Sequence, residues 1–171
     1  LTVSYENDWL NLTAGKNAVM VGSFEYDGYD IDSYYFMNSS FWNSFNCWQW
    51  GASASFYPDD DHELTIQVCN SPFSFGEPNL FAYALGWRGE MEWFESLWTA
   101  NMWQYDKGSY MKSMNFANRF DFDDFSFDLE YMTRATDIKD LFTRDFTLMI
   151  APTYQFSDWG RITGRFGWEK C

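Results

Sequence analysis

The sequence has few of the residues on which most catalytic and metal sites depend. It contains one histidine and three cysteines among 171 residues. The single His62 excludes zinc motifs built from histidine pairs. Cys47, Cys69 and Cys171 fit neither a metal cluster nor a dense disulfide framework, although a bridge between Cys47 and Cys69 on neighbouring predicted strands remains an alternative. A glycine-rich phosphate loop and a nucleophile elbow are also missing, so we expect no catalytic residues, no metal, no cofactor and no enzymatic activity.

Two further absences narrow the class of protein. No run reaches the roughly 18 consecutive apolar residues of a transmembrane helix. Only 11 Lys and Arg residues stand against 25 Asp and Glu residues, a formal net charge of −14, so we expect no nucleic-acid partner. Aromatic residues nevertheless make up 23% of the chain, and a disordered acidic chain contains few aromatics because it cannot bury them. These observations leave a β-rich fold.

Apolar and polar residues alternate with a period of two along most of the chain. In residues 80–88 one face carries Phe81, Tyr83, Leu85 and Trp87, and the other carries Ala82, Ala84, Gly86 and Arg88. The same alternation occurs in residues 48–57, 63–69, 124–134, 145–156 and 161–169. A period of two is that of a β-strand whose two faces lie in different environments. We therefore expect an all-β protein.

Turn signals separate these segments. They lie at 58–61, 89–90, 106–109, 121–124 and 157–160, where Pro, Gly, Asp and Ser residues gather. Spacing this short leaves no room for crossover helices, so the sequence predicts an antiparallel up-and-down meander of roughly ten strands, most of them about 9–12 residues long. Tilted strands of that length can cross a bilayer. Two longer connections, 22–46 and 70–79, break the rhythm, and short turns opposite long loops are typical of an outer-membrane barrel.

The character of the two faces separates a membrane barrel from a soluble sandwich. The polar faces carry small residues and charges of both signs, which suits a barrel interior better than a solvated surface. Aromatic residues also fall near strand ends, where amphipathic rings favour the headgroup level; they are Tyr57, Trp93, Trp103, Tyr105, Trp159 and Trp168. These patterns favour a transmembrane β-barrel. A soluble, aromatic-rich β-sandwich that binds carbohydrate stays the alternative, although its aromatics would cluster on one patch.

Several stretches resemble porins of Bacteroidetes outer membranes and, more distantly, the phosphate-selective porin O/P family. They are GSFEYDGYDID at 22–32, CWQWGAS at 47–53, QVCNSPF at 67–73, NLFAYALGWRG at 79–89, LEYMTRAT at 129–136 and FTRDFTLMIAPTYQFSD at 142–158. The resemblance implies an antiparallel transmembrane β-barrel, usually a homotrimer, with an inward-folded loop that narrows the pore. Members of that family are much longer than 171 residues, so residues 1–171 are expected to form a single porin-like region of a larger barrel.

Charged residues on the polar faces of the strands and in the long loop are expected to shape the pore. The pore-lining candidates are Arg88, Lys112, Arg119, Asp128, Glu130, Arg134, Arg161 and Arg165. The long loop 22–46 is the candidate constriction loop, with Glu25, Asp27, Asp30 and Asp32 as its charged residues. Phosphate selectivity would require a run of lumenal Arg and Lys, whereas this loop is acidic, so the resemblance does not extend to anion selectivity and the ion preference stays open. The expected function is passive diffusion of small hydrophilic solutes or ions across a bacterial outer membrane, with lipid, lipopolysaccharide and sister subunits as partners.

Overall fold

The computed structural model describes residues 1–18, 48–71, 80–138, 141–164 and 166–170. These residues form eleven β-strands. The strands are β1 (Thr2–Asn7), β2 (Leu10–Ala18), β3 (Trp48–Asp59), β4 (His62–Asn70), β5 (Phe81–Met91), β6 (Phe94–Asp106), β7 (Ser109–Phe122), β8 (Phe125–Ile138), β9 (Leu141–Ser157), β10 (Gly160–Thr163) and β11 (Phe166–Lys170). Within the described part of the chain, no helix is long and apolar enough to span a membrane.

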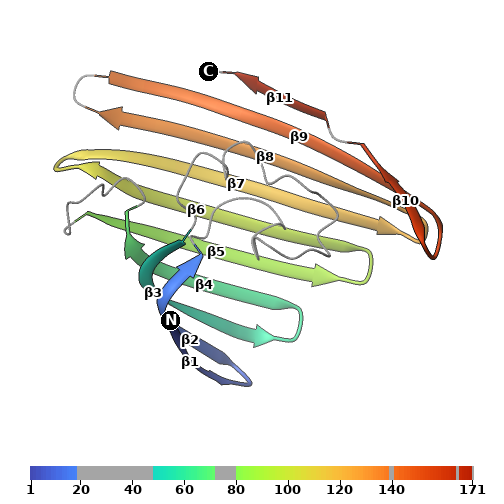
Figure 1. The fold of residues 1–171 in the computed structure, drawn as a ribbon, viewed down its shortest axis with the longest axis horizontal. Coiled ribbons are helices and arrows are strands. Elements are labelled where there is room, and N and C mark those ends of the chain that lie inside the picture. The colour runs from blue at the N-terminus through green and yellow to red at the C-terminus, as the bar shows by residue number, and fades with distance from the viewer. Residues whose placement is uncertain (19–47, 72–79, 139–140, 165, 171) are drawn as a thin grey trace.

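All eleven strands belong to one antiparallel sheet that follows the order of the sequence (Figure 1). Strands β10 and β11 both pair with β9, at different places along it: Ile162 lies opposite Tyr154, and Trp168 lies opposite Leu148. They therefore share one position in the sheet, which confirms the predicted meander of roughly ten strands. Among the described strands, β1 lies at one edge and β10 with β11 at the other, and these two edges do not pair with each other.

A proline in β9 explains why the last strand is interrupted. The Gly164 N–H donates a hydrogen bond to the Pro152 carbonyl at 2.9 Å, so Pro152 presents its backbone to the β10–β11 side. The N–H and C=O of a strand residue point toward the same neighbouring strand, so the donor that proline lacks is missing on this same side. Regular ladder pairing of β10 with β9 accordingly ends at Thr163, Gly164 keeps its single hydrogen bond to Pro152, and β11 pairs with β9 from Phe166.

The strands from β6 to β9 are longer than predicted, at 13, 14, 14 and 17 residues. The predicted turn at Gly89-Glu90 is also wrong, because β5 continues to Met91 and the chain turns at Glu92 and Trp93. A Cβ atom at Gly89 would lie 2.6 Å from the ring of Trp87. The glycine therefore makes room for an indole within a strand, and it does not mark a turn.

The two ends of the sheet differ in how they connect the strands. At one end, which we call the tight-turn end, every connection has two residues: Asp8–Trp9, Asp60–Asp61, Glu92–Trp93, Asp123–Asp124 and Asp158–Trp159. Asp123 has a φ of 47°, a left-handed conformation that two-residue hairpin turns require and that Asp tolerates. The other end contains the connections between β2 and β3 and between β4 and β5, whose residues 19–47 and 72–79 lie outside the described set. The β6–β7 turn at this end, Lys107–Gly108, is as short as those at the tight-turn end, so the predicted long connections occur only among the first strands of the described sheet.

Close approach of two strands at Gly51 gives a first testable expectation. A Cβ atom at this position would lie 2.3 Å from the Val68 carbonyl oxygen and 2.5 Å from the Cys69 Cβ atom. Both obstacles belong to the paired strand, so Gly51→Ala should lower the free energy of unfolding by about 1–3 kcal/mol through overpacking. Urea unfolding of the refolded chain, followed by tryptophan fluorescence, measures the change. Ser53→Ala, two residues along the same strand, is the control, and equal stability of the two variants would contradict the expectation.

Candidate functional site

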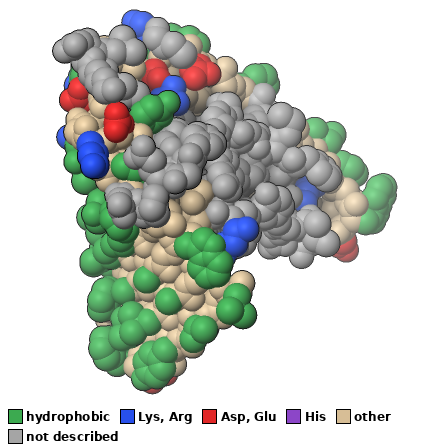
Figure 2. Space-filling view, turned by 60° about the vertical axis from the view of Figure 1, so that its left-hand side comes forward, with side chains coloured by type: hydrophobic (Ala, Val, Ile, Leu, Met, Phe, Trp, Pro, Cys, Tyr) green, Lys and Arg blue, Asp and Glu red, His purple; other side chains and the backbone are tan. Residues whose placement is uncertain are grey.

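The two faces of the sheet are inverted relative to a soluble protein. One face, the outer face, carries large apolar side chains that are exposed: Ile66 is 48% exposed, Leu85 is 49% exposed and Trp98 is 50% exposed. Tyr83 and Tyr131 on the same face are also exposed. In Figure 2, hydrophobic side chains line the left and lower parts of the visible surface. The outer face thus offers an apolar surface that crosses most of the strands.

The opposite face, the inner face, carries small and polar side chains that are buried. Gln67 on β4 is 3% exposed, Asn115 on β7 is 1% exposed and Glu130 on β8 is 4% exposed. Their cross-strand partners belong to the same face; for example, Gln67 lies opposite Ala84, and Ala117 lies opposite Glu130. Along its middle strands the sheet therefore buries many hydrogen-bonding side chains on one face and exposes apolar ones on the other, and the two faces differ as the alternation predicts.

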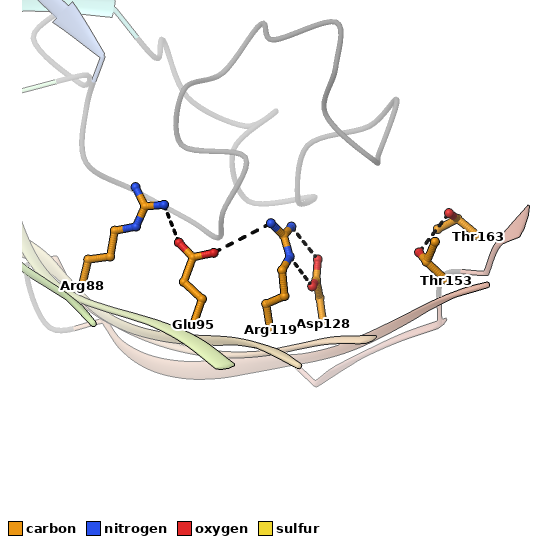
Figure 3. A network of polar contacts seen from close by, with 6 residues as sticks. All are labelled: Arg88, Glu95, Arg119, Asp128, Thr153 and Thr163. Atoms are coloured by element: carbon orange, nitrogen blue, oxygen red, sulfur yellow. Dashed lines mark hydrogen bonds and ion pairs between the residues drawn. The ribbon is translucent and has the colours of Figure 1, made fainter. Parts of the chain in front are cut away.

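Four charged residues form a ladder across the inner face near the tight-turn end (Figure 3). Arg88 Nη2 lies 2.6 Å from Glu95 Oε1, and Arg119 Nη1 lies 3.8 Å from Glu95 Oε2. Arg119 also binds Asp128 with two parallel hydrogen bonds, at 2.9 Å from Nε to Oδ1 and 3.2 Å from Nη2 to Oδ2. The ladder joins β5, β6, β7 and β8 in turn, so each strand contributes one charge that a neighbouring strand neutralises.

Further polar contacts continue along the same face. Arg134 on β8 forms an ion pair with Asp145 on β9, in which its Nε donates to Asp145 Oδ2 at 2.8 Å. Asn115 Nδ2 donates to Glu130 Oε1 at 2.9 Å. The Thr153 and Thr163 hydroxyls lie 3.0 Å apart and join β9 to β10 (Figure 3). These contacts hold the side chains of the inner face in fixed positions.

Negative charge predominates on the inner face. By register, its carboxylates are Glu6, Glu63, Glu90, Glu95, Asp121, Asp128, Glu130, Asp145 and Glu169. Among the described residues, its guanidinium groups are Arg88, Arg119, Arg134 and Arg161. Each guanidinium group can neutralise only one full charge, so the described part of the face has a negative net charge. A water-filled passage along this face would attract cations and repel anions.

The structure places most, but not all, of the predicted pore-lining residues together. The inner face holds Arg88, Arg119, Asp128, Glu130, Arg134 and Arg161. Lys112 is wrongly assigned, because it is exposed and alternates with the buried Met111 and Ser113, and so it lies on the outer face. Arg165 and the loop candidates Glu25, Asp27, Asp30 and Asp32 lie outside the described residues.

The partners of the charged residues were not predicted from the sequence. Glu95 and Asp145 connect the arginines across strands, yet neither was among the candidates. The alternation of side chains along each strand is enough to place both residues on the inner face. Only the register between strands shows that Glu95 lies opposite Arg119 and that Asp145 lies opposite Arg134. The alternation alone could have suggested Glu95 and Asp145 as inner-face residues, but their arginine partners could not be identified from one strand.

Aromatic side chains pack together close to the tight-turn end. The ring centroids of Phe94 and Phe120 lie 5.0 Å apart, and those of Phe120 and Phe127 lie 4.6 Å apart in a stacked arrangement. Trp93, in a tight turn, stacks on Phe122 at 6.2 Å. Trp103 was expected among the aromatic residues at the headgroup level, but it lies on the inner face and is buried. It shares this face with Thr99 and Asn101, because every second residue of β6 points to the same side.

The cysteines offer no evidence for the disulfide that the sequence left open. Cys69 is a buried free thiol on β4, and Cys47 lies outside the described residues. Among the described residues, no group of three or more His, Cys, Asp and Glu side chains is arranged to hold a metal ion. The site therefore consists of the inner face, with its paired charges and its buried neutral polar residues.

Comparison with known proteins adds no relative to this picture. No protein-family model matches the chain, and no curated protein or solved structure matches it.

Proposed function

We propose that this chain forms a porin-like β-barrel region in a bacterial outer membrane, through which small hydrophilic solutes or ions diffuse passively. The observation that carries the proposal is the inversion of the two faces, with exposed apolar side chains on one and buried polar side chains on the other. In a transmembrane barrel the apolar face meets lipid and the polar face lines the interior. In this proposal the paired charges of the inner face shape the wall of the passage.

The apolar character of the outer face favours contact with lipid rather than with water. Soluble monomers rarely expose a contiguous apolar patch of more than a few hundred Å², because such a surface drives association. The outer face is apolar along strands from β4 to β11, including Leu64, Leu85, Tyr131 and Trp168. A soluble sandwich would cover this surface with a second sheet. The described strands all lie in one sheet, so within them nothing supplies that cover.

The asymmetric ends suggest an orientation and partners. Outer-membrane barrels place short turns on the periplasmic side and longer loops outside the cell. The tight-turn end would then face the periplasm, with its aromatic cluster at the inner headgroup level. Lipid and lipopolysaccharide would surround the outer face. Sister subunits, in a homotrimer, are the further partners that the family resemblance implies.

Gel mobility in detergent tests the proposal most directly. The refolded chain should migrate differently when unboiled and when boiled, and its far-UV circular dichroism should show strong β-structure. This difference arises because a detergent-solvated barrel keeps its fold until heat opens it. A chain that stays soluble and monodisperse without detergent would instead favour the carbohydrate-binding sandwich.

Charge on the inner face predicts the sign of the ion preference. In a planar bilayer with a KCl gradient, the reversal potential should shift toward the equilibrium potential of K⁺, because carboxylates outnumber guanidinium groups along the passage. Replacing Glu63 and Glu90 with glutamine should reduce that shift. Lys112→Gln is the matched control, because Lys112 lies on the outer face and should leave the reversal potential unchanged. A shift toward the chloride potential in the unmodified chain would contradict the assignment.

A further inference from the structure

The middle of the inner face contains a compact group of neutral polar side chains. Thr99 and Asn101 on β6 lie directly opposite Asn115 and Ser113 on β7. All four side chains are at most 5% exposed. Directly opposed residues in an antiparallel pair have Cβ atoms about 4.5–5.5 Å apart, so the four form a single patch. We call these four residues the central polar patch.

Most hydrogen-bonding atoms of the central polar patch have no partner among the described residues. These atoms are the Thr99 Oγ1, both the Oδ1 and the Nδ2 of Asn101, the Ser113 Oγ and the Asn115 Oδ1. Only the Asn115 amide nitrogen is engaged, in its hydrogen bond to Glu130. Buried polar groups in folded proteins are almost always hydrogen-bonded, so several unpaired groups on adjoining strands call for a polar occupant.

The neighbours of the patch indicate what kind of occupant it takes. On the β5 side, Thr99 lies opposite Gly86 and Asn101 lies opposite Ala84, so no large side chain of β5 stands beside them. On the β8 side, Ser113 lies opposite Arg134, whose guanidinium group is already paired with Asp145. The patch itself carries no charge. It presents both donors and acceptors, which a charged solute would satisfy poorly.

We propose that the central polar patch is a binding subsite for a neutral, hydroxyl-bearing solute such as a small polyol or sugar. This inference rests on the proposed channel function and adds a class of solute to it. A hydroxyl group both donates and accepts, so it can satisfy an amide and a neighbouring hydroxyl at once. Water offers the same hydroxyl chemistry, and the test must separate the two.

Single-channel current in the presence of D-glucose distinguishes a bound sugar from water. The probe is glucose added in rising concentration to the full chain in a planar bilayer bathed in KCl. A binding subsite produces a saturable decrease in current with added current noise, whereas unbound glucose lowers the current only in proportion to solution conductivity. The test variant combines Asn101→Leu with Ser113→Ala. It should raise the glucose concentration at half-saturation by about tenfold or more, because it removes several hydrogen-bonding groups. Asn101→Ser is a milder variant for the case in which the double variant does not fold.

Lys112→Gln is the matched control, because Lys112 adjoins Ser113 on β7 but lies on the outer face. It should retain the glucose saturation of the unmodified chain. A saturable effect that persists in both patch variants would overturn the subsite. A purely proportional effect in the unmodified chain, with KCl currents intact, would overturn it as well and assign the patch to water, leaving the channel in place. Absence of any KCl current would overturn the channel proposal itself.

Discussion

Replacing Arg119 with methionine should lower the free energy of unfolding by about 3 kcal/mol, because breaking a buried ion pair leaves uncompensated charges. Arg119 is the cation between two carboxylates that are mostly buried, with exposed side-chain fractions of 12% for Glu95 and 7% for Asp128. Glu95 keeps Arg88 as a partner, but Asp128 loses both hydrogen bonds from the guanidinium group. Chemical unfolding of the refolded chain in detergent measures the loss.

Two comparisons make the Arg119 result specific to the ladder. Lys112→Met removes a positive charge from the same strand but from the outer face, and it should change stability little. Adding Asp128→Asn to Arg119→Met should recover part of the loss, because the buried group that remains is then uncharged. If Arg119→Met and Lys112→Met reduced stability equally, the ladder would have no particular role in holding the sheet together.

Introducing a charge on the outer face should be the other severe change. Leu148 lies on β9 between Tyr131 and Trp168, on the outer face that is proposed to meet lipid. Leu148→Arg should therefore cost about 2–4 kcal/mol or prevent insertion, and Leu129→Arg should act in the same way. The fraction of chain that becomes heat-modifiable in lipid vesicles measures insertion.

The neighbouring residue supplies the matched control. Thr147 precedes Leu148 and points to the inner face, so Thr147→Arg places the same charge at nearly the same depth but on the polar side. It should have a far milder effect, as should a charge at Ser126. Equal effects of Thr147→Arg and Leu148→Arg would show that the two faces do not meet different environments.

Much of the fold follows from local patterns in the sequence. The two-residue alternation in segments such as 80–88 and 145–156 predicts both the strands and their faces, because side chains in a strand point alternately to opposite sides. The paired turn residues at Asp123–Asp124 and Asp158–Trp159 predict the hairpins. The turn predicted at Gly89 was wrong because glycine can serve two purposes. It commonly marks a turn, but Gly89 lies inside a strand and accommodates the Trp87 ring.

The candidate site could be predicted only in part, for a related reason. Parity places Arg119 and Asp128 on the inner face, but it does not show which residues of different strands lie opposite each other. A shift of one residue in register would exchange the faces, so pairing such as Arg134 with Asp145 depends on the turns between the strands. Lys112 was predicted to line the pore because it is charged. It lies on the outer face, however, because it shares the alternation of Met114 and Phe116.

Pro152 also has a consequence for local opening at the edge of the sheet. Pro152 has no N–H to donate to the neighbouring strand. Two short segments, residues 160–163 and 166–170, therefore pair with β9 in place of one continuous strand. Short segments with few backbone hydrogen bonds open at low free-energy cost, independently of the rest of a structure. Amide hydrogens of β10 and β11 should therefore exchange with solvent deuterium much faster than those of β7 and β8, which pair over their full lengths with neighbours on both sides. A substitution of Pro152 with alanine restores the donor and should slow that exchange at the edge.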